Sequence, residues 1–342
     1  MNFTAYVEEQ LHLHPSTQPR DVIKQCYQAA KGAEHLLMDT TRARAYFDQE
    51  YAATPADAAQ PLFEAISDNV CRVNLAAWKA ASLPTDWLFR MFVHTASVPM
   101  GGSELLEQYI KEAAVVASAL PGWEEALAAW QETGMPAVHH SEEYRAAEKP
   151  AYRIVNGRFR CIIPILQRLQ EDSSIRIIAL DGRAASGKTT KAELLSAVLE
   201  TPVVHMDDFF LPPALRTPER LSQPGGNVDY ERFAQEVVPH LTSNNAFAYR
   251  IFDCSQMDFG GLREIAAAPI RIVEGSYAHH PALGDYADLR VFSTVEADEQ
   301  MARILSRNGE RMAEMFRTRW IPMEENYFAA FSIAEKADIL MK

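Results

Sequence analysis

The chain has 342 residues, of which 48% are hydrophobic and 23% are charged, and its formal net charge is −13. This is the composition of a globular protein with enough apolar residues for two hydrophobic cores. The acidic balance argues against a nucleic-acid-binding protein, which usually carries a basic stripe.

Four cysteines, Cys26, Cys71, Cys161 and Cys254, lie far apart in the sequence and form no C-x-x-C pair. This spacing predicts reduced thiols rather than a disulfide framework or a zinc site. The N-terminal residues "MNFTAYVEEQ" lack the basic and apolar regions of a secretory signal, and the apolar run "AAVVASAL" is far too short to span a bilayer. We therefore expect a soluble, cytoplasmic protein with no membrane partner.

The first 133 residues predict helices. Apolar residues recur at helical spacing over 21–37 and again over 103–120, where Ser103 is a candidate N-cap. Residues 122–134, "GWEEALAAWQETG", predict a further helix that ends at its last glycine. Because no strand alternation or internal repeat is evident, we predict an all-α N-terminal domain over 1–150.

Two prolines, Pro136 and Pro150, bracket a polar stretch that we interpret as the boundary between this domain and a second one over 151–342. The stretch contains His139 and His140 beside two glutamates, which together could hold a metal ion. A four-ligand site needs further convergent groups, and no second cluster with ligand spacing is present. Ordinary linker residues are the favoured interpretation.

After this boundary, short apolar runs alternate with helical segments. Continuously apolar strands separated by helices are typical of a parallel sheet covered on both faces, which predicts an α/β fold here. The predicted strands are "IRIIAL" (175–180), "PVVHM" (202–206), "PIRIVEG" (269–275), "LRVFST" (289–294) and "ADILM" (337–341).

The stretch "DGRAASGKTT" at 181–190 follows the first of these strands and opens a helix. It matches G-x-x-x-x-G-K-[ST], in which the backbone N–H groups and the helix N-terminus together cradle phosphate oxygens. The lysine would reach the β- and γ-phosphates of ATP, and the threonine after it would ligate Mg²⁺. A glycine-rich turn without a ligand is the alternative. The predicted nucleotide-binding residues are Gly182, Ala184, Ala185, Ser186, Gly187, Lys188, Thr189 and Thr190.

Acidic residues end the next two predicted strands. Ligand sites of parallel sheets lie outside the carboxyl ends of the strands, so these carboxylates should face the phosphate loop. Asp207, in "HMDDFFLPP", could accept a proton from an attacking hydroxyl or hold Mg²⁺ through water. Glu274, in "RIVEGSY", suits a carboxylate that orients Mg²⁺ or its water. The alternatives are a cap at Asp207 and an exposed strand-end side chain at Glu274.

Further motifs follow the phosphate loop in a fixed order: "MDDFF", "NVDYERF", "FDCSQMDF", "VEGSYA" and "ADIL". This ordered set resembles the uridine kinase, phosphoribulokinase and pantothenate kinase group of phosphate-loop kinases, over about residues 175–342. The resemblance implies a phosphate-loop NTPase sheet that transfers the γ-phosphoryl group of ATP, with Mg²⁺, to a hydroxyl of a small molecule.

The resemblance also implies roles for individual residues. Uridine kinases carry a catalytic base in an Asp-Ser-Phe-Tyr stretch that falls on Asp207, and a sugar-binding aspartate that falls on Asp229. Their Glu-Gly after the third strand falls on Glu274 and the following glycine. Their arginine-rich lid helix corresponds to "DEQMARILSRNGERM", which makes Arg303 and Arg307 candidate catalytic residues. The alternative for these two arginines is one solvated helix face.

The base-recognition residues of uridine kinases are only partly present. Those enzymes carry Tyr-Asp-Phe followed closely by a histidine, whereas this chain has Phe252, Asp253 and Cys254, with Met257 where the histidine would fall. Phe252 and Asp253 remain candidate substrate residues. The chain therefore resembles a small-molecule kinase of the uridine kinase type more than it resembles a uridine kinase.

A long proline- and glycine-rich insert over 211–233 carries two more candidates, Arg216 and Arg220, which could bind a phosphate or carboxylate of the acceptor. Solvated loop arginines are the alternative. We predict an ATP-dependent kinase whose acceptor is a nucleoside, a sugar or a vitamin-like alcohol. An NTP-dependent regulatory module and a structural protein with a vestigial loop are the rival hypotheses. The helical domain has several possible roles: it could shield the site, form a homodimer, or bind a regulator or part of the substrate.

Overall fold

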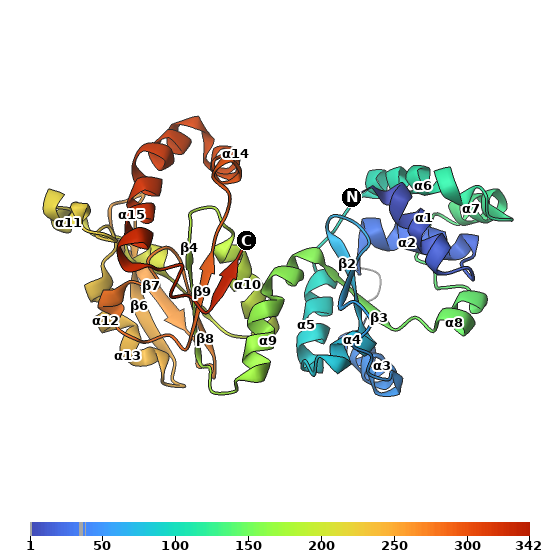
Figure 1. Cartoon of the computed structure of the whole chain (residues 1–342), viewed down its shortest axis with the longest axis horizontal. Helices are drawn as coiled ribbons and strands as arrows, with labels where there is room; N and C mark the ends of the chain where they lie inside the picture. The colour runs from blue at the N-terminus through green and yellow to red at the C-terminus, as the bar shows by residue number, and fades with distance from the viewer. Residues whose placement is uncertain (1, 34–36, 38) are drawn as a thin grey trace. The chain divides into compact units, whose positions relative to one another are not determined.

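The computed structural model describes residues 2–33, 37 and 39–342. The chain divides into two compact units, Met1–Arg160 and Cys161–Lys342 (Figure 1). The strand β3 (Tyr152–Asn156) belongs to the first unit because it pairs antiparallel with β2 (Val70–Asn74). In the described part of the chain, no helix has the length and apolar character needed to cross a membrane.

The first unit is mainly helical, as predicted, but it also contains a three-stranded antiparallel sheet that the sequence analysis missed. Its strands are β1 (Phe63–Ala65), β2 and β3. The strands are short, and four successive residues of β2 are buried, so the polar–apolar alternation that signals a strand is absent. The helices are α1 (Phe3–Leu13), α2 (Pro19–Lys31), α3 (Thr40–Ala53), α4 (Leu75–Ala80), α5 (Thr85–Ala96), α6 (Ser103–Ala117), α7 (Trp123–Glu132) and α8 (Glu142–Glu148).

Two helix ends of this unit differ from prediction. The N-cap of α6 is Gly102, and Ser103 is its first helical residue. The helix α2 ends at Lys31 because Gly32 takes a left-handed φ of 61°, so it stops short of the predicted 21–37 span. Residues 34–36 of that span lie outside the described residues.

The second unit contains the predicted parallel sheet, and all five predicted runs are strands. The strand order is β10-β9-β4-β8-β5, and every neighbouring pair is parallel. The carboxyl ends of β4, β8 and β5 therefore meet at one edge of the sheet. The strands are β4 (Ile177–Gly182), β5 (Val203–His205), β8 (Arg271–Glu274), β9 (Leu289–Ser293) and β10 (Ile339–Met341).

Helices and a hairpin cover this sheet. The hairpin consists of β6 (Phe247–Asp253) and β7 (Asp258–Ile265), and it was not predicted. The helices of this unit are α9 (Ile163–Glu171), α10 (Lys188–Leu199), α11 (Pro218–Ser222), α12 (Tyr230–Glu236), α13 (Val238–Leu241), α14 (Ala297–Met315) and α15 (Ile321–Phe331). In Figure 1, α10 lies on one side of the strands, and the hairpin lies on the other with α12 and α13.

One large core joins these elements. Tyr249 and Ile265 of the hairpin, Phe233 of α12, Val273 of β8 and Tyr327 of α15 are all buried in it. Packing of this apolar surface contributes roughly 25 cal/mol for each Å² removed from water. The core therefore fixes the hairpin and α15 beside the edge of the sheet where β4, β8 and β5 end.

Candidate active site

The turn between β4 and α10 has the strand–turn–helix geometry that a phosphate loop requires. Gly182 has φ of 137°, and a Cβ there would lie 1.9 Å from the carbonyl oxygen of Ser293, so only glycine fits. Gly187 takes a left-handed φ of 84° as the N-cap of α10. The first-turn residues of α10, Lys188 to Thr190, have N–H groups without an acceptor inside the helix. These donors are available to phosphate oxygens.

The lysine of the loop lies along the loop backbone. The Lys188 Nζ donates to the carbonyl oxygens of Gly182 and Arg183, at 2.8 and 2.9 Å. A second buried lysine, Lys191, donates to the carbonyl of Ser186 at 2.8 Å, and burial lowers its pKa. Both ammonium groups therefore bind loop carbonyls, and the Lys188 charge lies within the loop itself.

Glu274 is placed next to the loop by the register of the sheet, because it is the partner of Leu180 on β4 and of His205 on β5. The Thr189 hydroxyl donates to Glu274 Oε2 at 3.2 Å. The His205 Nδ1 lies 2.6 Å from Glu274 Oε1, and this hydrogen bond raises the pKa of His205. His205 is a site residue that the sequence analysis missed, although its position at a strand end was a usable signal.

Asp207 follows β5 in the short 3-10 turn Met206–Phe209 and its side chain reaches solvent. Surrounding protein atoms desolvate the carboxyl and raise its pKa, and repulsion from Glu274 raises it further. Attraction to Lys188 acts in the opposite direction. Asp207 thus lies within electrostatic reach of both residues, as the sequence analysis expected of a group facing the loop.

The second aspartate of the pair has a different place. Asp208 is buried and accepts hydrogen bonds from the Tyr249 hydroxyl at 2.9 Å and from Arg263 Nε at 2.7 Å. Both partners belong to the hairpin. Asp208 therefore fixes the hairpin against the turn, whereas the neighbouring Asp207 is exposed.

Glu324 of α15 is a further site residue that sequence reasoning missed. It is buried, and it accepts from the Ala184 N–H of the loop at 2.9 Å and from the Ser276 hydroxyl at 2.7 Å. Burial raises the pKa of Glu324, and attraction to Lys188 opposes that change. A carboxylate oxygen thus accepts a hydrogen bond from a backbone N–H that belongs to the candidate phosphate cradle.

The helix α14, which the resemblance implies to be a lid, contacts the loop through one of the two predicted arginines. Arg303 Nη1 donates to the carbonyl of Ala185 at 3.0 Å, and the buried Gln300 donates to the carbonyl of Ala184 at 2.9 Å. Arg307 is exposed and donates to the side chain of Asn308. The structure brings Arg303, and not Arg307, to the phosphate loop.

The segment around Asp229 lies beside the Asp207 turn. The Asp229 N–H donates to the carbonyl of Phe209 at 2.7 Å, and its buried carboxylate caps α12 by accepting from the Arg232 N–H at 3.0 Å. In the same segment, Asn227 Oδ1 is buried and has no hydrogen-bond partner among the described residues. An unpartnered buried acceptor is costly and needs a donor from water, an ion or a ligand.

The other predicted substrate residues belong to the hairpin and its surroundings. The Asp253 carboxylate accepts from the N–H of Ser255 at 2.7 Å, which closes the hairpin turn. Phe252 is buried against Phe259. The Arg216 Nε donates to a backbone carbonyl at 2.7 Å, and its guanidinium carbon lies 5.8 Å from the Phe252 ring centre. All three side chains are therefore engaged in contacts within the protein.

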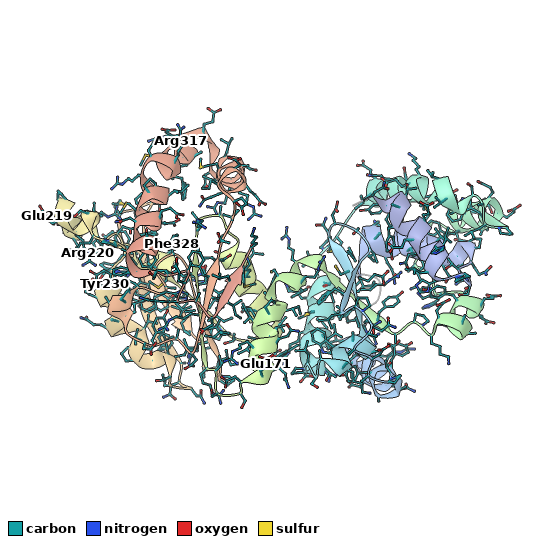
Figure 2. All side chains as sticks on the ribbon, viewed as in Figure 1. Glu171, Glu219, Arg220, Tyr230, Arg317 and Phe328 are labelled. Carbon is teal, nitrogen blue, oxygen red and sulfur yellow. The ribbon has the colours of Figure 1, made fainter. Side chains whose placement is uncertain are left out.

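Arg220 is also engaged within the protein. Its guanidinium carbon lies 4.0 Å from the ring centre of Tyr230, and both residues are labelled in Figure 2. Its Nη1 and Nη2 both bind the carboxylate of Glu231, at 2.6 and 2.7 Å. Aromatic stacking and a bidentate ion pair hold the side chain in one orientation. Arg220 therefore orders the insert between β5 and β6.

The residues at the loop also fit a magnesium ion. Mg²⁺ prefers oxygen ligands and usually keeps several waters while it binds substrate phosphates. The Thr189 hydroxyl and the Glu274 carboxylate supply adjacent oxygens, and their mutual hydrogen bond shows that they point to the same space. Neither at the loop nor elsewhere do the described residues contain a cluster of three or more His, Cys, Asp or Glu side chains that could hold a metal by themselves. His140 instead lies 2.8 Å from Asp21.

Comparison with known proteins finds solved structures that are similar to about half of this chain. No protein-family model matches the chain, and no curated protein matches it. A possible uridine kinase from Bacillus stearothermophilus is 19% identical, with a TM-score of 0.42, over 54% of this chain and 98% of that one. A proposed fructose transport system kinase from Silicibacter sp. TM1040 is 24% identical, with a TM-score of 0.44, over 54% of this chain and 98% of that one. Similarity at this level does not identify an acceptor.

Proposed function

We propose that the second unit is an ATP- and Mg²⁺-dependent kinase that phosphorylates a hydroxyl group of a small molecule. One arrangement carries this proposal: the loop residues Lys188 and Thr189 lie beside two carboxylates, Glu274 and Asp207, on neighbouring strand ends. Phosphoryl transfer needs a cradle for the triphosphate, oxygens for a metal and a base for the acceptor. These residues supply all three kinds of group.

In the proposed reaction, Asp207 accepts the proton of the acceptor hydroxyl as its oxygen forms a bond to the γ-phosphorus. The bond from that phosphorus to the β–γ bridging oxygen breaks, and ADP leaves with the electron pair. Lys188 and the first-turn amides of α10 neutralise charge on the phosphate oxygens, which is the larger part of catalysis in such sites. Thr189 and Glu274 would hold Mg²⁺, which supplies further charge neutralisation when bound.

The acceptor is proposed to bind between the Asp207 turn and the segment that carries Asn227 and Asp229. The buried Oδ1 of Asn227 has no hydrogen-bond donor among the described residues, and the hydroxyl groups of a polyol can donate to it. The proposed partner is therefore a small hydroxylated molecule. Nucleic acid remains disfavoured by the net charge of −13.

An ADP-release assay coupled to NADH oxidation tests the function. Nucleosides, sugars, polyols, vitamins and amino alcohols are screened with Mg-ATP, and we expect one class to raise ADP release well above the acceptor-free rate. Asp207→Asn and Lys188→Ala should both lose this acceptor-dependent rate. Tight nucleotide binding without acceptor-dependent turnover for any compound would instead support the rival hypothesis of a regulatory NTP-binding module.

A further inference from the structure

One face of α2, in the first unit, buries four polar side chains that the proposed kinase chemistry does not use. Asp21, Lys24, Gln25 and Gln28 have the spacing that places them on one side of a helix. Their exposed fractions are 0%, 8%, 0% and 1%. Charged and amide side chains are rarely buried this fully unless they have partners. Their partners therefore indicate what this face is built to hold.

The buried negative charge has a full set of donors. Asp21 accepts from the backbone N–H and the hydroxyl of Ser141, at 2.9 and 2.5 Å, and from the N–H of Gln18 at 3.0 Å. His140 Nδ1 lies 2.8 Å from the same carboxylate, and its Nε2 lies 2.7 Å from the Tyr152 hydroxyl. Burial alone would raise the pKa of Asp21, but these hydrogen bonds hold it below its usual value. Asp21 needs no further ligand.

The buried guanidinium beside this face does not have a full set of acceptors. Arg72, which is 3% exposed, donates to Gln28 Oε1 at 3.2 Å and to Glu64 Oε1 at 3.3 Å. Both bonds are long, and its Nε is buried without a hydrogen-bond partner in the described part of the chain. A guanidinium has five donors, and a buried charge is costly unless they are used. The plane of the group is fixed, because it lies 4.7 Å from the ring centre of Tyr152.

Two further groups on α2 are similarly under-satisfied. The Lys24 Nζ donates to the carbonyl of Val138 at 3.3 Å, and burial together with repulsion from Arg72 lowers its pKa to about 8. Among the described residues, neither the nitrogen nor the oxygen of the Gln25 amide has a hydrogen-bond partner. The buried N–H donors of Arg72, Lys24 and Gln25 thus have too few acceptors in the described part of the chain, whereas the Asp21 carboxylate has its full set of donors.

We propose that this face of α2 binds the oxyanion group, carboxylate or phosphate, of a small metabolite, with Arg72, Lys24 and Gln25 as its donors. An oxyanion supplies several acceptor lone pairs and a negative charge in one group, which is what these three side chains lack. It would form charge-assisted hydrogen bonds, which are about twice as strong as neutral ones. The site lies wholly within the first unit and is independent of the proposed kinase function.

Isothermal titration of the full-length chain with inorganic phosphate and with malonate tests the proposal. The Lys188→Ala background is used so that the phosphate loop does not contribute. We expect saturable one-to-one binding of at least one probe, and Lys24→Met should raise the Kd of that probe about tenfold or more. Binding of phosphate indicates a phosphate site, and binding of malonate indicates a carboxylate site. Lys31→Met, in the last turn of the same helix, is the matched control and should bind as the background does. The proposal is overturned if neither probe saturates below about 10 mM, or if Lys24→Met binds like Lys31→Met.

A second variant separates a binding role from a structural one. Gln25→Leu replaces a buried amide that has no partner with an apolar group of similar size. If the amide exists for a ligand, its removal should raise Tm by about 2–8 °C and abolish or weaken probe binding. A lower Tm, or unchanged binding of the probe, would show that Gln25 is part of the packing and would overturn its assignment as a ligand donor.

Discussion

Replacing Glu324 with glutamine should tighten the binding of ATP. The Glu324 carboxylate accepts the Ala184 N–H, a donor of the candidate phosphate cradle. A phosphate oxygen that approaches the same donor meets a buried negative charge. Glutamine can keep both contacts, because its oxygen can accept from Ala184 and its nitrogen can donate to the Ser276 oxygen, so the fold should be retained.

The size of the effect follows from the distance. Two groups that share one amide donor lie about 4 Å apart, and two unit charges at that separation repel by about 4 kcal/mol at an effective dielectric constant of about 20. Attraction of Glu324 to Lys188 and movement of the side chain reduce this value, and we take about 1–2 kcal/mol as the remaining penalty. The Kd for ATP should therefore fall by about 5–30-fold in the Glu324→Gln variant.

Calorimetric titration with ATP at pH 7.5 and low salt measures this change. Glu325→Gln is the matched control: it lies next to Glu324 on α15 but pairs with Arg183 at the half-exposed surface, at 2.6 Å, so its effect should be small. Burial raises the pKa of Glu324, so this carboxylate takes up a proton at a higher pH than an ordinary glutamate does. The difference between wild type and Glu324→Gln should therefore shrink as the pH falls through that raised pKa. Unchanged or weaker ATP binding in Glu324→Gln would refute the competition between carboxylate and phosphate.

Two other predictions concern the transfer step. Lys188→Ala should remove most of the turnover and most of the rise in Tm that Mg-ATP gives the wild type, because the lysine neutralises negative charge on the phosphate oxygens. Equal turnover and an equal rise in Tm in the two proteins would contradict this prediction. Asp207→Asn should lower kcat by about 10²–10⁴-fold and leave the Kd for ATP nearly unchanged. Because desolvation by the surrounding protein atoms and repulsion from Glu274 raise the pKa of Asp207, wild-type turnover should fall as the pH drops through that raised pKa, in a profile that the asparagine variant lacks. A variant that binds ATP poorly but turns over normally at saturation would make Asp207 a nucleotide or metal ligand.

The sheet was predictable because its signal is local. Each parallel strand is buried on both faces and reads as a continuous apolar run, and the strand β4 has all six residues buried. The phosphate loop was predictable for the same reason, since its glycines, lysine and threonine lie within eight consecutive positions. The hairpin was not predictable in this way, because most residues of β7 are exposed and two are glycines. Such a strand shows neither an apolar run nor a clear alternation.

The missed site residues depend on contacts that the sequence does not display. The bond from Ala184 to Glu324 joins residues 140 positions apart and requires α15 to pack beside the loop. The contact between His205 and Glu274 depends on the register of β5 against β8. The resemblance predicted two lid arginines but did not distinguish them, and only the placement of α14 brings Arg303 to the loop.

Uridine should be a poor acceptor, and this last prediction rests on the hairpin end. A pyrimidine is read by directional hydrogen bonds and ring stacking, and here Asp253 closes the turn while Phe252 is buried against Phe259. Met257, in place of the histidine of uridine kinases, offers no strong donor or acceptor. A site that hydrogen-bonds its substrate can reject analogues by about 10⁴–10⁵-fold, whereas an apolar site cannot. Discrimination between uridine and cytidine should therefore be weak if either reacts.

A polyol should be markedly better than either nucleoside, because the Asn227 oxygen, which has no hydrogen-bond partner among the described residues, and the Asp229 carboxylate both belong to the segment beside the Asp207 turn. Steady-state kinetics with uridine, cytidine and a polyol panel measures kcat/KM for each acceptor. Asn227→Leu tests the origin of the preference: it removes the acceptor of the hydroxyl hydrogen bond and should lower kcat/KM for the best polyol by about 10-fold or more. The Kd for ATP should stay the same in this variant. Efficient and selective phosphorylation of uridine would show that residues other than Phe252, Asp253 and Met257 read the base, and the polyol assignment would then be wrong.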